Sequence, residues 1–194
     1  MTNLSLHNYA RIEAERYYTI EADRLIPAAH RHVCFSGKIH EPAAGQRHMA
    51  IELEKIPGVT SVFCSDIQAA PGVIQMPIEA FAGDIDVDWV CTNLPFGKQD
   101  TLMAHLLDAY PRQKHAYLVR SAFIAPAKRD TLIHNNPRFA GSIVLSKRPR
   151  WIENSSGSPA VDYSWIVFGG QGFSAAPKLA FENGPTVDFF GEGV

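Results

Sequence analysis

The sequence contains no run of about 20 apolar residues, which is the length that a membrane-spanning helix requires. Its first residues, MTNLSLHNYARIEAER, also lack the apolar segment of a secretory signal. There are only three cysteines, and no two of them form a CxxC pair. Cys64 and Cys91 lie inside apolar runs, so we expect buried thiols in the reducing environment of a cytoplasm.

Repeats, low-complexity tracts and linkers are absent as well. The length of 194 residues, with 46% hydrophobic and 20% charged residues, is ordinary for one globular domain. We therefore expect a single domain over residues 1–194, with the segments 1–16 and 171–194 at its periphery.

Neither sign of charge dominates, because the net charge is only −2. The charges are nevertheless distributed unevenly, since the stretch 112–150 holds nine basic residues and only one acidic residue, Asp130. A partner with a phosphate backbone requires such a basic segment, although a solvated surface produces the same pattern. The basic residues are Arg112, Lys114, Arg120, Lys128, Arg129, Arg138, Lys147, Arg148 and Arg150.

Short β-branched runs alternate with helix-like segments, which predicts an α/β fold with a largely parallel sheet. The helices are expected at 21–32, 47–56, 101–109 and 127–134. The strands are expected at 38–41, 60–64, 72–76, 86–91, 116–119, 142–145 and 163–168. The last two strands would form an antiparallel pair at the sheet edge, and the Gly- and Pro-rich residues from 169 onward would be loop.

Polar or glycine-rich residues follow three of the expected strands. They are Glu41-Pro42-Ala43-Ala44-Gly45, Ser65-Asp66 and Thr92-Asn93-Leu94-Pro95-Phe96. Ligands of open α/β sheets bind outside the carboxyl ends of the strands, so these residues predict one site. Gly45 would let the backbone approach a ligand, and Asp66, about 20 residues further on, would accept hydrogen bonds from ribose hydroxyls.

The segment from Asn93 to Phe96 offers an amide oxygen, the Leu94 carbonyl, a rigid proline and an aromatic plane. Two acceptors beside a stacking ring suit the exocyclic amine of a flat base, which in a duplex must first be flipped out. Taken alone, the same residues also suit an ordinary turn, and Asp66 suits a helix cap.

At these residues the sequence resembles the class I adenine N6-methyltransferases, particularly the short DNA enzymes of phages and prophages. The matching motifs are the turn 41–45, Asp66 with Ile67, and the segment 93–96. The segments 17–19, 148–151 and 163–167 are similar to other parts of that group, so the resemblance extends from Tyr17 to Phe168.

The resemblance implies a Rossmann-like class I methyltransferase fold, with a seven-stranded, mostly parallel sheet and helices on both faces. It implies S-adenosylmethionine as the cofactor and the N6 amine of adenine in DNA as the substrate. The catalytic residues would be Asn93, Leu94, Pro95 and Phe96. The cofactor would be held by Thr19, Glu41, Pro42, Ala43, Gly45, Asp66, Ile67 and Asn93. No metal is expected, because His30 and His32 point to different faces of a helix.

The sequence departs from the family pattern at Arg47, where a second glycine is usual, and at Leu94, which replaces a proline. Glu79 and Asp84 are both candidates for the usual acidic residue after the third strand. An RNA adenine methyltransferase, a protein glutamine methyltransferase and a degenerate fold that binds nucleic acid therefore remain alternatives. The basic stretch favours nucleic acid, and DNA over RNA. We expect a monomer without a separate target-recognition domain.

Overall fold

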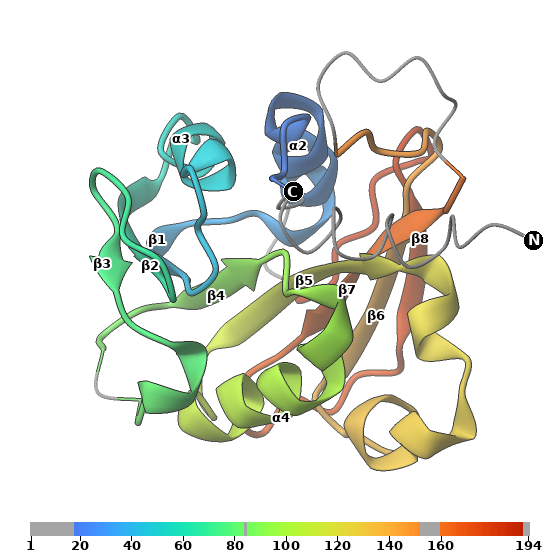
Figure 1. Cartoon of the computed structure of the whole chain (residues 1–194). Coiled ribbons are helices and arrows are strands. Elements are labelled where there is room, and N and C mark those ends of the chain that lie inside the picture. The colour runs from blue at the N-terminus through green and yellow to red at the C-terminus, as the bar shows by residue number, and fades with distance from the viewer. Residues whose placement is uncertain (1–17, 84, 152–159, 192–194) are drawn as a thin grey trace, which may run out of the picture.

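The structure of the chain is a computed structural model, which describes residues 18–83, 85–151 and 160–191. Its strands form one sheet in the order β3-β2-β1-β4-β5-β7-β6-β8 (Figure 1). β7 is antiparallel to both of its neighbours, and every other pairing is parallel. The strands are β1 (Gly37–Glu41), β2 (Val59–Asp66), β3 (Ile74–Gln75), β4 (Trp89–Thr92), β5 (Lys114–Arg120), β6 (Phe139–Val144), β7 (Tyr163–Phe168) and β8 (Lys178–Phe181).

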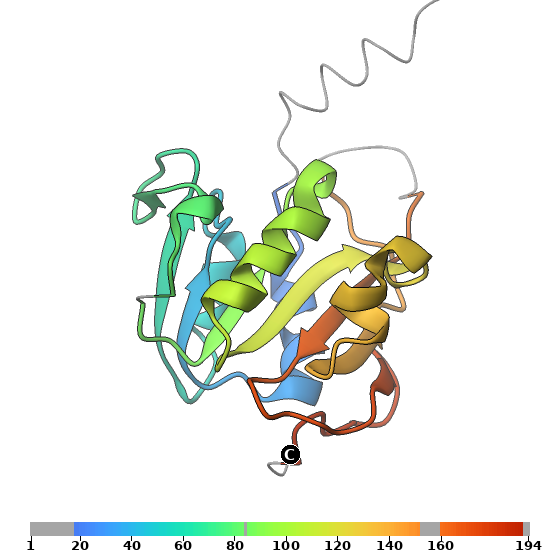
Figure 2. The same ribbon diagram turned by 90° about the horizontal axis from the view of Figure 1, so that it is seen from below.

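Helices cover both faces of the sheet, as Figures 1 and 2 show. α2 (Ala22–Val33) and α3 (His48–Leu53) lie on one face, and α4 (Gln99–Ala109) lies on the other. A separate core cluster fills each interface. The shorter turns are η1 (Ile78–Ala80), η2 (Phe96–Lys98), η3 (Ser121–Ile124), η4 (Ala127–Arg129) and η5 (Asp130–His134). The expected fold class is confirmed, and among the described residues no helix is long and apolar enough to cross a membrane.

The predicted apolar face explains how α2 packs on the sheet, and the predicted helix bounds are close to those of α4. Ala22, Leu25, Ile26 and Ala29 recur at helical spacing, and all four are buried against the sheet. α4 begins two residues before the predicted start and ends at Ala109 as predicted. α3 is shorter than predicted, because it ends at Leu53.

Most strands differ from the prediction at their ends, and β6 begins at Phe139 instead of residue 142. β2 continues through Asp66, whereas β4 begins only at Trp89 instead of residue 86. The residues before β4 bind β1 through their side chains: the Asp88 carboxylate accepts a hydrogen bond from the Lys38 backbone N–H at 2.7 Å, and Asp86 pairs with the Lys38 ammonium. The strand expected at 72–76 is reduced to the two residues of β3.

The helix expected at 127–134 is instead a 3₁₀ turn followed by one π turn. Asn135 donates to the Asp130 carbonyl from its backbone N–H and to the Asp130 carboxylate from its side chain, both at 2.7 Å. Such local side-chain bonds compete with a regular helix, and here they widen the last turn.

The segment after Gly169 is not merely a peripheral loop. Residues 178–181 form β8, which pairs with β6 in parallel, so β6 and β7 are antiparallel but do not form the sheet edge. Ala180 and Phe189 are each only 1% exposed and belong to the core on the α2 side. The glycines and prolines of this segment lie between its buried residues, and the sheet therefore has eight strands instead of seven.

Candidate functional site

The turn after β1 and the end of β2 meet at the carboxyl edge of the sheet. Pro42 and Ala43 form the first part of the turn, and Gly45 adopts a φ of 51°, which glycine tolerates best. The Gly45 N–H donates to the Asp66 carboxylate at 2.9 Å, and the Ala44 N–H donates to the Ser65 carbonyl at 3.0 Å. The structure thus brings two of the three sequence segments together.

Asp66 shapes this turn with both of its oxygens, since its second oxygen accepts from the Gln68 N–H at 2.9 Å. A carboxylate has about four acceptor directions, so further donors such as ribose hydroxyls are compatible with both bonds. The neighbouring Ile67 is 67% exposed, which leaves an apolar side chain in solvent beside the carboxylate. An exposed apolar side chain next to an acceptor suits a nucleoside, with the ribose at the carboxylate and the base against the apolar side chain.

Glu41, the last residue of β1, is only 2% exposed. Burial raises the pKa of its carboxyl well above the usual range, although a hydrogen bond from the Ala50 backbone and the charge of Arg47 oppose the shift. One carboxyl oxygen, Oε2, has no hydrogen-bond partner among the described residues. Burial therefore favours the protonated, neutral form of this carboxyl, and a bound cation would favour the ionised form.

Asn93 lies just beyond the end of β4, and β4 is the neighbour of β1 in the sheet. Its amide nitrogen donates to the Thr19 hydroxyl at 3.2 Å, which connects two residues that the sequence assigns to the site. Its amide oxygen is buried without a hydrogen-bond partner among the described residues. An unsatisfied buried acceptor costs about 1–3 kcal/mol, and this one lies at the carboxyl edge of the sheet, next to the glycine turn and Asp66.

Leu94 differs from the family proline without disturbing the backbone acceptor. Its side chain is 1% exposed and packs into the core on the α4 side. Its carbonyl accepts a hydrogen bond from the Gln99 side chain at 3.2 Å and retains a second lone pair. Sequence reasoning missed Gln99, because the helix was predicted to begin at residue 101 and the burial of Gln99 is visible only in the structure. Pro95 is exposed.

Phe96 lies in an aromatic cluster built from distant segments. Its ring centroid is 6.1 Å from that of Trp151 and 5.9 Å from that of Tyr163. The guanidinium of Arg120 lies 4.9 Å from the ring centroid. The sequence placed Phe96 at the target base but did not identify these three neighbours.

Arg47 occupies the position of the missing second glycine with a glycine-like φ of 65°. Its guanidinium pairs with Glu54, which directly follows α3, and it lies against Gly72. The side chain is therefore directed along α3 and away from Gly45.

Arg47→Gly tests whether this side chain obstructs the site. Loss of left-handed strain, of about 1–3 kcal/mol, is offset by a more flexible unfolded chain and by loss of a partly exposed ion pair. We expect little change in melting temperature and in the affinity for S-adenosylmethionine, measured by scanning and titration calorimetry. A gain in affinity of tenfold or more would show that Arg47 blocks the site.

Two further residues, Tyr18 and Glu79, contact segments of the candidate site. The Tyr18 ring lies against Gly45, where a Cβ atom would come within 2.9 Å of it. Glu79, in η1 after β3, pairs with Lys98 at 3.7 Å and thereby connects η1 to the segment after Phe96. The other acidic candidate, Asp84, and Tyr17, the first residue of the family-like segment 17–19, lie outside the described residues.

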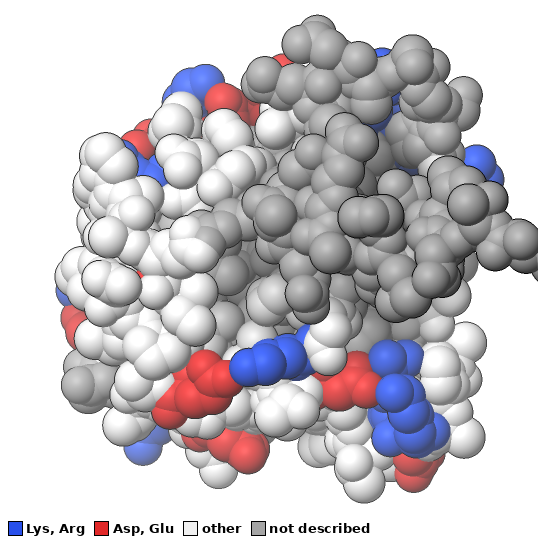
Figure 3. Space-filling model, in the orientation of Figure 1, with Lys and Arg blue, Asp and Glu red and all other residues white. Residues whose placement is uncertain are grey.

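The basic stretch divides between the two edges of the sheet. Arg112 and Lys114 lie at the amino end of β5, and Arg138 precedes β6 and donates to four backbone carbonyls. The other six follow the carboxyl ends of β5 and β6: Arg120, Lys128, Arg129, Lys147, Arg148 and Arg150. Several of these form ion pairs, and Figure 3 shows acidic and basic side chains alternating along the lower rim. Only the second group lies on the side of Asn93.

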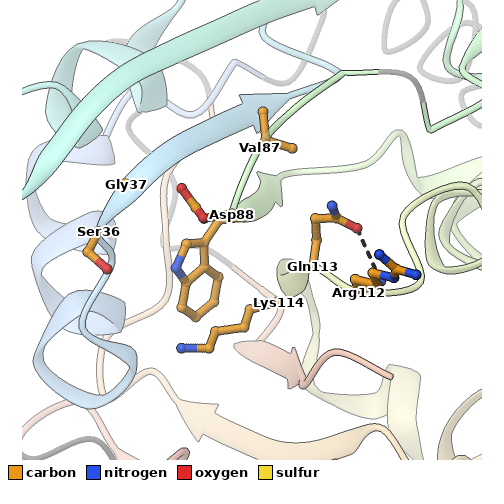
Figure 4. Close-up of a pocket in the computed structure, with 8 residues that line it drawn as sticks. Ser36, Gly37, Val87, Asp88, Arg112, Gln113 and Lys114 are labelled. Carbon is orange, nitrogen blue, oxygen red and sulfur yellow. Dashed lines mark hydrogen bonds between the residues drawn. The ribbon is translucent and has the colours of Figure 1, made fainter. Parts of the chain in front are cut away.

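A pocket of about 430 Å³ lies at the opposite, amino-terminal edge of the sheet (Figure 4). Asp88 and Lys114 bring opposite charges to its wall, and the Gln113 side chain accepts a hydrogen bond from the Arg112 N–H. Sites in parallel sheets lie at the carboxyl ends, so this pocket is separate from the candidate site.

No protein-family model and no curated protein sequence matches the chain. A solved structure from Listeria monocytogenes, described as a class I S-adenosylmethionine-dependent methyltransferase, has a TM-score of 0.56 and 14% identity, covering 84% of this chain and 64% of that one. Another from Vibrio vulnificus, described as the modification subunit of a type I restriction enzyme, has a TM-score of 0.52 and 13% identity, covering 82% of this chain and 45% of that one. The chain thus spans less than two thirds of either protein, and both likenesses show the Rossmann-like class I methyltransferase fold.

Proposed function

We propose that the chain is an S-adenosylmethionine-dependent methyltransferase that acts on the N6 amine of adenine in DNA. The observation that carries this proposal is the unpartnered Asn93 amide oxygen, which lies beside the Leu94 carbonyl at the carboxyl edge of a methyltransferase fold. The glycine turn and Asp66 lie at the same edge.

The residues of the β1 turn fit the cofactor. The unpartnered, buried oxygen of Glu41 suits its cationic methionine end, and Thr19 lies beside Asn93. Asp66 and Ile67 would bind the ribose and the adenine, while Gly45, Pro42 and Ala43 let the backbone approach. When bound, S-adenosylmethionine would supply an electrophilic methyl group, with its sulfonium sulfur as the leaving group, and the methylated amine would lose a proton to water.

Asn93 and Leu94 would act on the amine of the target base. Their two oxygens accept its two N–H groups and orient the nitrogen lone pair. Positive charge develops on this nitrogen in the transition state, and acceptors fixed in place stabilise it. Gln99 holds the Leu94 carbonyl, and Phe96 offers a ring for stacking. The chain's own residues need form no covalent intermediate.

The basic residues after β5 and β6 support a nucleic-acid substrate, because they lie on the side of Asn93 and would bind phosphates. The Vibrio likeness, whose description names the modification subunit of a type I restriction enzyme, favours DNA over RNA. We propose a monomer with little sequence specificity of its own, or with specificity supplied by a partner protein. RNA adenine and protein glutamine are the alternative substrates, and a non-catalytic binding module is the alternative function.

Calorimetric titration with S-adenosylmethionine, with Asp66→Ala as the control, tests the cofactor site. We expect binding by the wild type and its loss in the variant, with both proteins folded. Radiolabelled methyl transfer to single-stranded DNA, duplex DNA, RNA and a glutamine peptide then tests the substrate. Transfer to RNA or peptide alone would replace DNA as the substrate, and absence of cofactor binding by folded wild type would favour the binding module.

A further inference from the structure

Arg120, the last residue of β5, is exposed, and its guanidinium lies over the Phe96 ring. Among the described residues it has no carboxylate within ion-pair distance. Other cations near the catalytic segment differ, because Lys98 pairs with Glu79 and Arg129 pairs with Asp100. The guanidinium of Arg120 therefore lies over an aromatic ring, and within residues 18–83, 85–151 and 160–191 no carboxylate pairs with its N–H donors.

The Arg120 guanidinium covers one face of the Phe96 ring. The sequence predicts that the target base stacks on this same ring. An exposed cation–π contact contributes about 0.5–1 kcal/mol, whereas a base stacked on an aromatic side chain contributes about 1–3 kcal/mol. An entering base can therefore displace Arg120 from this face. The side chain remains attached to the end of β5, and β5 pairs with β4, which leads into the segment of Asn93 and Phe96.

A displaced guanidinium in this position would meet the backbone of the strand that carries the base. Its five donors match the oxygens of a phosphate in a bidentate arrangement, which a lysine ammonium does not reproduce. The same residue can thus cover Phe96 in the empty site and bind a phosphate in the occupied one.

We propose that Arg120 is a specificity-determining residue, which recognises the phosphodiester next to the base that displaces it from Phe96. This inference rests on the proposed function and deepens it. The site then accepts a base within a polynucleotide strand and discriminates against a free nucleoside and against a glutamine side chain, neither of which carries a phosphate.

The test uses single-stranded DNA oligonucleotides with one adenine. In one form the linkages flanking the adenine are ordinary phosphodiesters, and in the other they are neutral methylphosphonates. KM and kcat for methyl transfer and Kd by fluorescence anisotropy are measured for the wild type, Arg120→Gln and Arg120→Lys. Arg112→Gln is the matched control, because it removes the same charge at the opposite edge of the sheet.

For the wild type and Arg112→Gln, we expect the neutral linkages to raise Kd and KM by about tenfold, with a smaller effect on kcat. For Arg120→Gln, Kd and KM should already be about tenfold higher with the ordinary phosphodiester strand, and the neutral linkages should raise them no further. The slope of log Kd against log salt should fall by about one in this variant. The Kd and KM of Arg120→Lys for the ordinary strand should lie between those of the wild type and those of Arg120→Gln.

Equal sensitivity of the wild type and Arg120→Gln to the neutral linkages would overturn the inference, while continued methyl transfer would leave the proposed function intact. Tighter binding of both strands by Arg120→Gln would also overturn it, because Arg120 would then only cover the ring. Failure of the wild type to bind or methylate any strand, despite binding S-adenosylmethionine, would overturn the inference and the DNA substrate together.

Discussion

Asn93→Ala is expected to lower kcat for methyl transfer by a factor on the order of 10²–10³, the usual result of removing one preorganised group that stabilises transition-state charge. The variant deletes the unpartnered amide oxygen and leaves the Leu94 carbonyl, which Gln99 holds separately. The affinity for S-adenosylmethionine should change far less than kcat. Single-turnover transfer and calorimetric titration of the same preparation separate the two effects.

Thr92→Val provides the matched control for this variant. Thr92 is the residue before Asn93, it is fully buried, and its hydroxyl has no hydrogen-bond partner among the described residues. Replacing an unsatisfied hydroxyl by a methyl group of similar size should leave activity intact and leave stability equal or higher. Wild-type activity in Asn93→Ala would show that the segment is only a strand-to-loop turn.

The ends of the strands at the candidate site could be anticipated because their chemistry is local. A glycine needed for a bend, an acid about 20 residues later and an Asn-Leu-Pro-Phe segment are recognisable without knowing the sheet order. The pairing of Gly45 with Asp66 then follows from β1 and β2 being neighbours in a parallel sheet. The face of α2 was equally accessible, because its helical spacing depends on nothing outside the helix.

Contacts set by the register between strands were not predictable in this way. Arg120 and Phe96 are 24 positions apart, and they meet because β4 and β5 pair in a particular register. The basic stretch is continuous in the sequence, yet β5 and β6 both cross the sheet from edge to edge within it. Its charges are therefore separated onto two edges, which composition alone cannot show.

The strand in the tail was missed, and the direction of the Arg47 side chain was left open, for a different reason. The periodic signal of β8 is only four residues long, and it is burial of Ala180 against β6 that decides its conformation. The sequence shows that a bulky residue follows the glycine turn, but the available carboxylate of Glu54 determines where its side chain lies. In both places tertiary packing outweighs the local pattern.

Glu41→Gln is expected to stabilise the fold and to weaken binding of S-adenosylmethionine. Burial raises the pKa of the Glu41 carboxyl, so between the unfolded and the folded pKa the folded protein holds a proton that the unfolded chain has lost. Stability therefore falls as pH rises from the unfolded value near 4.5 towards the raised folded value. Glutamine is neutral at every pH and removes this loss.

The variant should therefore melt at a higher temperature than the wild type at pH 7, and the difference should shrink towards pH 4. Each kcal/mol of stabilisation corresponds to roughly 2–4 °C for a chain of this size. Scanning calorimetry between pH 4 and pH 7 measures the melting temperatures of both proteins and the change of their difference with pH. Glu54→Gln is the control, since it neutralises a nearby carboxylate that is 42% exposed and should not raise the melting temperature.

Binding is expected to change in the opposite direction to stability. A cation placed against Glu41 favours the ionised carboxyl, so the wild type should release a proton on binding S-adenosylmethionine and bind it more tightly as pH rises. Titrations in buffers of different ionisation enthalpy detect that proton. Glu41→Gln should lose the proton release, the pH dependence and most of the affinity. An unchanged affinity would mean that the buried acid is a structural residue, whereas the predicted result would mean that the site keeps an unfavourable buried acid because it needs the charge in the bound state.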